Sequence, residues 1–331
     1  MSFGSWRTSR RTFCGTLAYV LVAPAIAIAQ TSKVRRIGVL EPGIPDPPQE
    51  IWKRDEPLRK LGWIEGKNLH VERRYDNGRS EALQALAEEL VRAEVEIIVT
   101  NGTPATLAAK RATTTIPIFF SVADPVVLGL VASLARPGGN LTGFSRAGPE
   151  VSSKYLSVLK ELVPRLQRVG VLWQAGNPYN RASEGQFEHV CRSLGLVPTI
   201  VEIGAAGEIP DAIAQLVRQH VEAVVLASDA IVLDHRLEIV DAATKHGWPT
   251  MAEYPGMVTE TGALIAYSPS LDEEYRLRAE YIDRILRGAK PAELPVQRPT
   301  KFELVINLKT AKALGITVPK ELLLRADEVI Q

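Results

Sequence analysis

The 331-residue sequence has few cysteines and almost no net charge. Its two cysteines, Cys14 and Cys191, are too few for a disulfide framework or a structural zinc site. Lysine and arginine total 39 against 38 aspartates and glutamates, so the formal charge is +1 and there is no electrostatic footprint for nucleic acid. The hydrophobic content of 46% and the charged content of 23% exclude a disordered chain, a fibre and a polytopic membrane protein.

Signatures of catalysis and cofactor binding are also missing. The sequence has no G-x-G-x-x-G, no P-loop and no G-x-S-x-G motif. Its five histidines show no metal-ligand spacing, and no nucleophile, base and acid can be assembled into a set. We therefore predict no catalytic residue, no metal and no cofactor. The single cysteine beyond the first thirty residues, Cys191, lies in a helical pattern and is interpreted as a buried, inert thiol.

Residues 1–29 have the pattern of an export signal. Three arginines and no acid precede an uncharged run, and small residues alternate up to Ala29. The apolar core is too short to span a bilayer comfortably, and the residues around Arg10-Arg11 resemble a twin-arginine signal. We expect cleavage near Ala29 and a periplasmic mature chain. An uncleaved amphipathic anchor is the alternative.

Short apolar runs alternate with amphipathic stretches in the first half of the remaining chain. The predicted elements are strand 36–40, a helix ending at 61, strand 68–75, a helix over 80–92 capped by Ser80, strand 95–100, helix 104–113, strand 116–121 and helix 125–135. The sequence Arg-Pro-Gly-Gly-Asn at 136–140 interrupts the alternation, and 141–144 is a short strand or a crossing segment. This alternation is typical of a parallel sheet with right-handed crossovers.

The same alternation restarts near residue 146. The predicted elements are helix 150–163, strand 168–173, helix 180–194, strand 198–203, helix 208–219, strand 223–227, helix 231–246, strand 249–252, helix 271–287, strand 302–307 and helix 308–314. We therefore predict an α/β fold with two Rossmann-like lobes joined by a hinge. Lobe 1 comprises 34–145 plus about 272–296, and lobe 2 comprises 146–271 plus about 297–331, so the chain crosses between lobes several times.

Candidate ligand-binding residues follow the predicted strands, because ligands of open α/β sheets bind outside the carboxyl ends of the strands. The candidates are Gly43, Asn101, Gly102, Thr103, Pro104, Ser121, Asp124, Trp173, Asn177, Tyr179, Asp229, Glu253 and Tyr254. Thr103 can cap the next helix with Pro104 in its first turn, which leaves backbone N–H groups free for a carboxylate or phosphate. Ordinary capping explains the same residues without a ligand.

The acidic and aromatic candidates also have two interpretations. Asp124 and Asp229 either cap the helices that follow them or accept a ligand ammonium. Trp173, Tyr179 and Tyr254 either flank an apolar or aromatic ligand side chain or pack within the lobes.

Four segments resemble a bacterial protein family. They are Leu-Arg-Lys-Leu-Gly-Trp-Ile-Glu-Gly-Lys-Asn-Leu at 58–69, Ala-Arg-Pro-Gly-Gly-Asn-Leu-Thr-Gly at 135–143, Ala-Lys-Pro-Ala-Glu-Leu-Pro-Val at 289–296 and Pro-Thr-Lys-Phe-Glu-Leu-Val-Ile-Asn-Leu-Lys-Thr-Ala at 299–311. The chain is similar to the ABC-transporter substrate-binding proteins of the tryptophan-binding type from about Val34 to Ile330. The resemblance implies a type I periplasmic binding protein fold, whose lobes close on a small ligand that is then handed to an inner-membrane permease.

The resemblance and the residues together predict a monomeric periplasmic receptor of an ABC import system. Its ligand is expected to be amino-acid-like or an aromatic carboxylate, trapped between the lobes by hinge closure. Two alternatives remain open at this point: an exported α/β enzyme acting on a small metabolite, and a ligand-sensing receptor for a membrane signalling protein.

Overall fold

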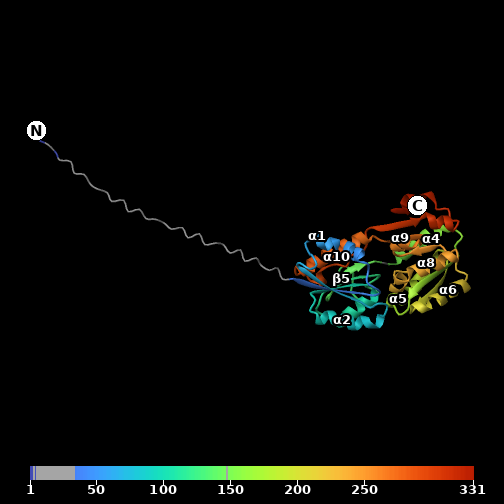
Figure 1. Ribbon diagram of the computed structural model, residues 1–331, viewed down its shortest axis with the longest axis horizontal. Coiled ribbons are helices and arrows are strands. Elements are labelled where there is room, and N and C mark those ends of the chain that lie inside the picture. Colours follow the sequence, from blue (N-terminus) through green and yellow to red (C-terminus); the bar gives the residue numbers. More distant parts are fainter. Residues whose placement is uncertain (3, 5–33, 147) are drawn as a thin grey trace. The chain divides into compact units, whose positions relative to one another are not determined.

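The computed structural model describes residues 1–2, 4, 34–146 and 148–331. Val34–Gln331 forms one compact unit (Figure 1). The predicted export signal at 1–29 lies, apart from residues 1, 2 and 4, outside the described residues. None of the described helices has both the length and the apolar character that crossing a bilayer requires.

The first sheet contains five parallel strands in the order β2-β1-β3-β4-β5. Its segment of the chain contains β1 (Arg35–Glu41), α1 (Pro48–Lys60), β2 (Leu69–Tyr75), α2 (Leu83–Arg92), β3 (Ile97–Asn101), α3 (Thr103–Ala112), β4 (Ile118–Val122) and β5 (Leu141–Ser145). The central strands are covered on both faces, which explains their almost continuous apolar sequences.

The second sheet contains seven strands in the order β12-β11-β10-β9-β8-β6-β7. The elements that lead up to β10 are α4 (Pro149–Leu162), β6 (Arg168–Gln174), α5 (Pro178–Ser193), β7 (Val197–Ile203), α6 (Ile209–Arg218), β8 (Ala223–Leu226), α7 (Ala230–Asp234), α8 (Arg236–Lys245), β9 (Thr250–Ala252), α9 (Gly256–Thr261) and β10 (Ile265–Pro269). The strands β7, β6, β8, β9 and β10 pair in parallel, and β11 is antiparallel to β10.

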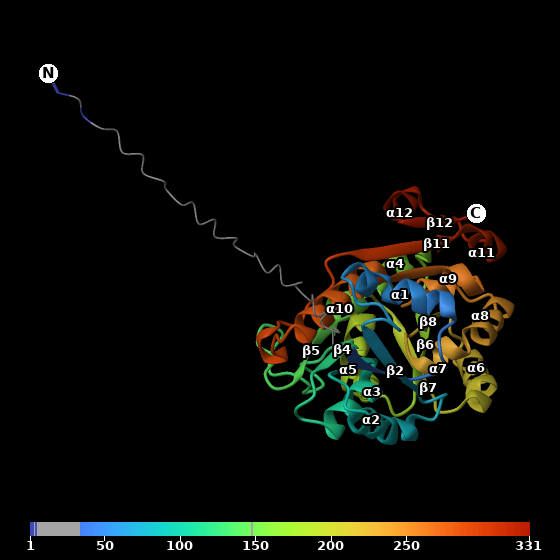
Figure 2. The same ribbon diagram turned by 60° about the vertical axis from the view of Figure 1, so that its left-hand side comes forward.

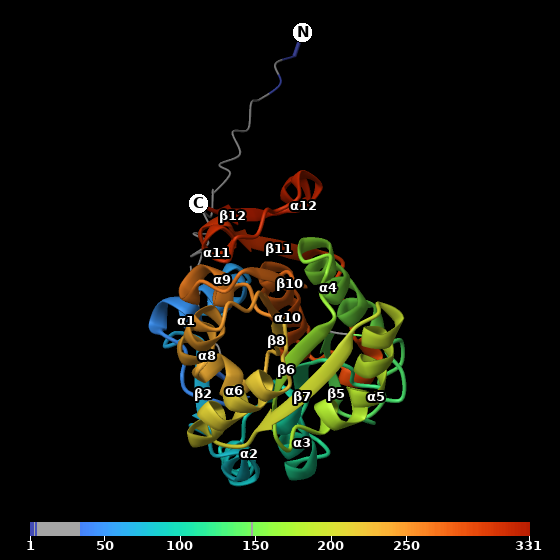
Figure 3. The same ribbon diagram turned by 90° about the vertical axis from the view of Figure 1, so that its right-hand side faces the viewer.

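The C-terminal segment packs a helix on the first sheet and adds strands to the second. It contains α10 (Leu271–Leu286), β11 (Phe302–Asn307), α11 (Leu308–Ala313), α12 (Lys320–Arg325) and β12 (Glu328–Ile330). Helix α10 packs against α1 and the first sheet (Figure 2). There Tyr281 and Ile282 join the core formed by Ile37, Val39 and Phe119. The strands β11 and β12 instead extend the second sheet beyond β10 (Figure 3). The two-lobed α/β architecture predicted from the sequence is therefore confirmed.

Hydrogen bonds hold residues 294–297, which follow α10, beside β5. Gln297 N–H donates to the Gly143 carbonyl at 2.9 Å, and Ser145 N–H donates to the Gln297 carbonyl at 2.8 Å. The Thr142 hydroxyl donates to the Leu294 carbonyl at 2.7 Å. The chain returning from α10 thus runs beside β5, which is itself the point where the chain leaves the first sheet.

Three predicted helices differ from the structure. Residues 125–135 form turns rather than a helix, because Gly129 adopts a left-handed φ of 61° after a single turn capped by the side chain of Asp124. The helix predicted at 231–246 is divided at His235 into α7, which borders the cavity described below, and α8, which covers the sheet. Ser80 begins a short 3-10 turn and caps no helix, since α2 starts at Leu83.

Candidate ligand-binding site

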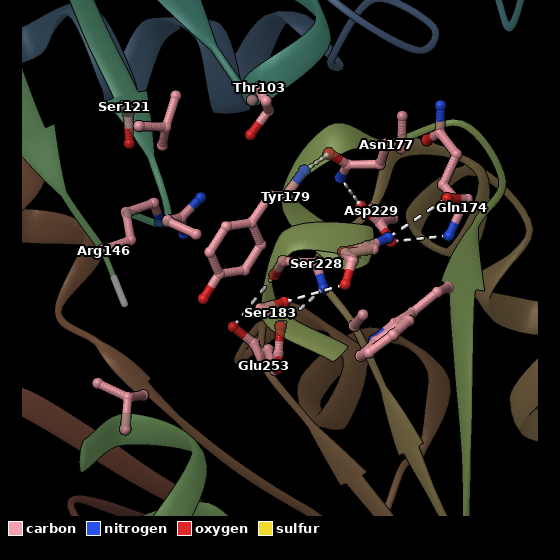
Figure 4. Close-up of a pocket in the computed structure, with 18 of the residues that line it drawn as sticks. Thr103, Ser121, Arg146, Gln174, Asn177, Tyr179, Ser183, Ser228, Asp229 and Glu253 are labelled. Carbon is pink, nitrogen blue, oxygen red and sulfur yellow. Dashed lines mark hydrogen bonds between the residues drawn. The ribbon is translucent and has the colours of Figure 1, made fainter. Parts of the chain in front are cut away.

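A cavity of about 200 Å³ lies where the carboxyl ends of the two sheets meet (Figure 4). The residues that follow β1, β3, β4 and β5 form one wall, and those that follow β6, β8 and β9 form the other. Helices α4 and α5 contribute further side chains, including Tyr155 and Phe187. The cavity therefore lies beyond the carboxyl ends of the parallel strands of both sheets, where ligands of open α/β sheets bind.

The turn between β3 and α3 forms part of the first wall. Gly102 is the N-cap residue, and its left-handed φ of 79° suits glycine. Thr103 is the first helical residue and makes no capping hydrogen bond through its side chain, so the prediction that Thr103 caps this helix is wrong. Its hydroxyl oxygen is among the atoms at the cavity (Figure 4), and the helix N-terminus still presents unpaired backbone N–H groups.

Arg146 stands directly after β5 and also lines the first wall. Its Nε lies 3.2 Å from Glu274 Oε2, and the hydroxyl of Ser121 donates to Glu274 Oε1 at 2.7 Å. Glu274 is buried in the first turn of α10. The carboxylate of Glu274 thus holds two residues of this wall from behind.

Asp229 organises the second wall. Its Oδ2 accepts hydrogen bonds from Gln174 N–H at 2.8 Å and from Asn180 Nδ2 at 2.7 Å. Its Oδ1 accepts one from Asn177 Nδ2 at 2.6 Å. Burial raises the pKa of the Asp229 carboxyl even though these three hydrogen bonds favour the ionised form. Asp229 thereby ties the end of β6 and the first turn of α5 to the start of α7.

Glu253 follows β9 and is half-buried at the cavity. Its Oε2 accepts a hydrogen bond from Ser228 N–H at 3.1 Å, and the hydroxyl of Tyr155 also hydrogen-bonds to the carboxylate. Burial raises the pKa of Glu253 to about 7, and the nearby charge of Asp229 acts in the same direction. The cavity therefore contains a carboxyl group that changes charge near neutral pH.

Aromatic rings supply much of the apolar surface. Trp173 packs edge-on against Phe187, with the ring centroids 5.5 Å apart, and Tyr155, Tyr179 and Tyr267 also line the cavity. Burial raises the pKa of Tyr179, so this phenol stays neutral. The combination of several rings with a few polar groups is typical of a pocket for a small organic ligand.

The two walls also contact each other at the rim. The backbone N–H of Ile44 hydrogen-bonds to the carboxylate of Asp234 in α7, and burial raises the pKa of Asp234. The side-chain amide of Gln174 donates to the Ser80 hydroxyl at 3.3 Å. These contacts join the loop after β1 and the start of the 3-10 turn to the second sheet.

Ten of the thirteen candidates predicted from the sequence line this cavity. They are Asn101, Gly102, Thr103, Pro104, Ser121, Trp173, Asn177, Tyr179, Asp229 and Glu253. The other three lie elsewhere. Gly43 N–H donates to Asp76 Oδ1 at 2.8 Å beside the rim contact, and Asp124 accepts from the backbone N–H groups of the turn that follows it. Tyr254 packs against a core of the second sheet that includes Val232 and Met257.

The prediction missed further lining residues for two different reasons. Arg146 follows a strand, so the same rule would have found it had 141–145 been treated as a full strand. Tyr155 and Phe187 lie inside helices, and helical periodicity alone does not distinguish a core position from a cavity position. Within the described residues, no three His, Cys, Asp or Glu side chains come together as metal ligands.

Comparison with known proteins identifies the family to which this chain belongs. The family model of the ABC transporter substrate binding protein matches residues 54–330, and the chain belongs to that family. A tyrosine-binding protein of Clostridioides difficile is 26% identical over 261 residues, which cover 78% of this chain and 74% of the relative. The fold is that of type I periplasmic binding proteins, and the chain is a binding protein for a small ligand rather than an enzyme.

Two solved structures are similar over nearly the whole compact unit. The complex of an ABC domain from Streptococcus pneumonia with L-Trp has a TM-score of 0.81 at 24% identity, covering 89% of this chain and 99% of that chain. The ligand-free, open structure of a substrate binding protein with adhesive properties from Clostridium difficile has a TM-score of 0.63 at 24% identity, covering 90% and 100%.

Proposed function

We propose that this protein is a periplasmic receptor that captures an aromatic amino acid, or a similar aromatic carboxylate, for an ABC import system. The observation that supports this most directly is the composition of the cavity, in which Arg146 and Glu253 accompany a cluster of aromatic rings. One relative is a tyrosine-binding protein and a similar structure contains L-Trp, which favours the same ligand class.

The proposal includes hinge closure around the ligand. The rim contacts of Asp234 and Gln174 join the two walls, as expected for a closed arrangement. The chain also superposes more closely on the L-Trp complex than on the ligand-free, open structure, at equal sequence identity and similar coverage. We assign 34–145 plus about 272–296 to one moving lobe and 146–271 plus about 297–331 to the other.

The delivery route is the remaining part of the proposal. Residues 1–29 would direct export and be cleaved near Ala29, and the monomeric mature protein would pass its ligand to an inner-membrane permease. Sequencing the N-terminus of protein recovered from the periplasm tests the export step, and an N-terminus that still contains Arg10-Arg11 would contradict it.

A binding screen tests the ligand class. Purified protein without the first 29 residues is titrated calorimetrically with L-tyrosine, L-tryptophan, L-phenylalanine, benzoate, L-leucine and L-glutamate. We expect at least one aromatic compound to bind, and to add about 2.7 kcal/mol of stability in a thermal unfolding assay at a hundredfold excess over its Kd. Binding of only the non-aromatic compounds, or of none, would contradict the proposal.

Two variants then locate the binding site. Tyr179→Leu removes a polar ring from the cavity wall, and we expect it to weaken binding at least tenfold. Trp52→Leu is the matched control, since Trp52 is 59% exposed on α1 and does not line the cavity. Equal effects of the two substitutions would show that the ligand binds elsewhere.

A further inference from the structure

We infer that two side chains divide the recognition of a zwitterionic ligand: Arg146 binds its carboxylate and Glu253 binds its ammonium group, while Asp229 positions the wall without touching the ligand. This inference rests on the proposed function, and it names the contacts inside that site. It replaces the expectation that the carboxylate lies on the N-terminus of α3 and the ammonium near Asp124 or Asp229.

Few side chains could pair with the charged groups of a zwitterion, because only three charged residues of the described chain line the cavity. They are Arg146, Asp229 and Glu253. Asp124, which the sequence suggested as an ammonium acceptor, is not among them, and its Oδ1 accepts from Val126 N–H and Val127 N–H at 3.0 and 3.1 Å. A zwitterion in this cavity therefore meets one cation and two carboxylates.

Asp229 has little capacity left for a ligand. Three short hydrogen bonds from Gln174, Asn177 and Asn180 occupy both of its oxygens, and the residue is only 8% exposed. Removing any of these donors to make room for an ammonium group would leave a polar group unpaired at a buried position. Asp229 is thus suited to hold the strand end and the helix turn in place.

Glu253 has the opposite character. Its carboxylate takes two hydrogen bonds, from Ser228 N–H to Oε2 and from the Tyr155 hydroxyl, where Asp229 takes three. The titratable or charged groups near its carboxylate are Asp229, Tyr155, Tyr179 and Arg146. Burial beside Asp229 disfavours the ionised form, and a ligand ammonium would reverse this by pairing with the charge.

Among the residues that the structure describes, Arg146 is paired with another residue through only one of its three guanidinium nitrogens. Its Nε faces Glu274, and neither of its two terminal nitrogens hydrogen-bonds to an acceptor within 34–146 or 148–331. A guanidinium held by one edge can still present its terminal N–H groups to a carboxylate. Figure 4 shows Arg146, Tyr179 and Glu253 around the same space.

The two side chains come from different sheets. Arg146 follows β5 at the point where the chain leaves the first sheet, and Glu253 follows β9 of the second. They are close enough for the Arg146 charge to favour ionised Glu253. An α-amino acid whose two charged groups contact both residues would link the two sheets, so recognition of the zwitterion would also favour closure.

The test uses ligands that each lack one charge. L-Tyrosine is compared with tyramine, which has no carboxylate, and with 3-(4-hydroxyphenyl)propionate, which has no ammonium. The corresponding set is L-tryptophan, tryptamine and indole-3-propionate. Each compound is titrated calorimetrically against the wild-type protein and the variants Glu253→Gln, Arg146→Gln and Asp229→Asn, with Glu202→Gln on the exposed side of β7 as the control.

We expect Glu253→Gln to weaken the amino acid and the amine at least thirtyfold and the propionate less than threefold. Arg146→Gln should weaken the amino acid and the propionate in the same way and spare the amine. Asp229→Asn should weaken all three compounds by similar factors, because it disturbs the wall. Circular dichroism verifies folding, and Glu253→Ala and Arg146→Ala replace any variant that does not fold.

Failure of this inference is distinguishable from failure of the proposed function. If the wild-type protein binds none of the aromatic compounds in the binding screen, the proposed function itself is wrong. If it binds benzoate but no aromatic amino acid, the proposed function stands and the inference of a zwitterionic ligand is overturned. If it binds L-tyrosine or L-tryptophan but Glu253→Gln weakens the amino acid and the propionate equally, the inference is overturned and the proposed function stands. An ammonium-selective loss in Asp229→Asn would also overturn the inference.

Discussion

Replacing Glu253 by glutamine should stabilise the ligand-free protein at neutral and alkaline pH. Folding raises the pKa of this carboxyl from 4.5 to about 7. Between pH 4.5 and about pH 7 the folded protein therefore binds more protons than the unfolded chain. Stability therefore falls as pH rises through this window, and the full cost of the buried charge is present above pH 7. Glutamine has a similar shape and carries no charge, so it avoids this cost.

The magnitude follows from the size of the pKa shift. A change from 4.5 to about 7 corresponds to about 3 kcal/mol at 1.36 kcal/mol per pH unit. For a chain of this size, each kcal/mol changes Tm by roughly 2 °C. We expect the variant to unfold at about 6 °C above the wild type at pH 8, and at nearly the same temperature at pH 4.5.

Thermal unfolding followed by circular dichroism between pH 4.5 and 8 measures this difference directly. Glu202→Gln on the exposed side of β7 is the control, and its difference from the wild type should not follow the same curve. If Glu253→Gln unfolds at or below the wild-type temperature at pH 8, or if the difference does not grow from pH 4.5 to 8, the assignment of a buried, costly charge at this position is refuted.

Three further predictions concern other parts of the molecule. Gly43→Ala should lower the free energy of unfolding in urea by about 2 kcal/mol, since φ is 86° and the new methyl group meets the Asp234 carboxylate of α7. The control Gly62→Ala also has a left-handed φ, of 93°, but its methyl group meets no atom, so it should lose only about 1 kcal/mol, and equal losses would argue against the rim contact. Cys191 should not react with a thiol reagent at pH 8 until the protein unfolds, because burial raises its pKa to about 12; rapid reaction of the native protein would contradict its position in the core. Asp229→Ala should lower the free energy of unfolding by about 3 kcal/mol, because it leaves three hydrogen-bond donors unpaired. The control Asp124→Ala removes only a turn cap and should cost about 1 kcal/mol, and similar losses would exclude a positioning role for Asp229.

The buried strands were the most predictable part of the fold. The predicted strand at 302–307 coincides with β11, and 168–173 is within one residue of β6, because both are apolar runs bounded by turns or helices. Short elements gave no comparable signal. Strand β10 ends in a proline, α12 has six residues and β12 has three, so pairing and packing from distant segments decide their structure.

The site was predictable as far as topology determines it. Reading the residues after each strand located both walls, since the carboxyl ends of parallel strands gather at one edge. The role of each acidic residue was not predictable in this way. Whether Asp229 is satisfied by protein donors and Glu253 remains available depends on side chains from α4 and α5, whose positions result from packing between distant segments.

The return of α10 to the first sheet has a consequence for biosynthesis. The first core is completed by Tyr281, Ile282 and Leu294, which leave the ribosome more than a hundred residues after β5. A nascent chain that ends before α10 leaves one apolar face of the first sheet without this cover, so we expect the N-terminal half on its own to be unstable. Completion of the first sheet's cover therefore waits for the last part of the chain to be synthesised.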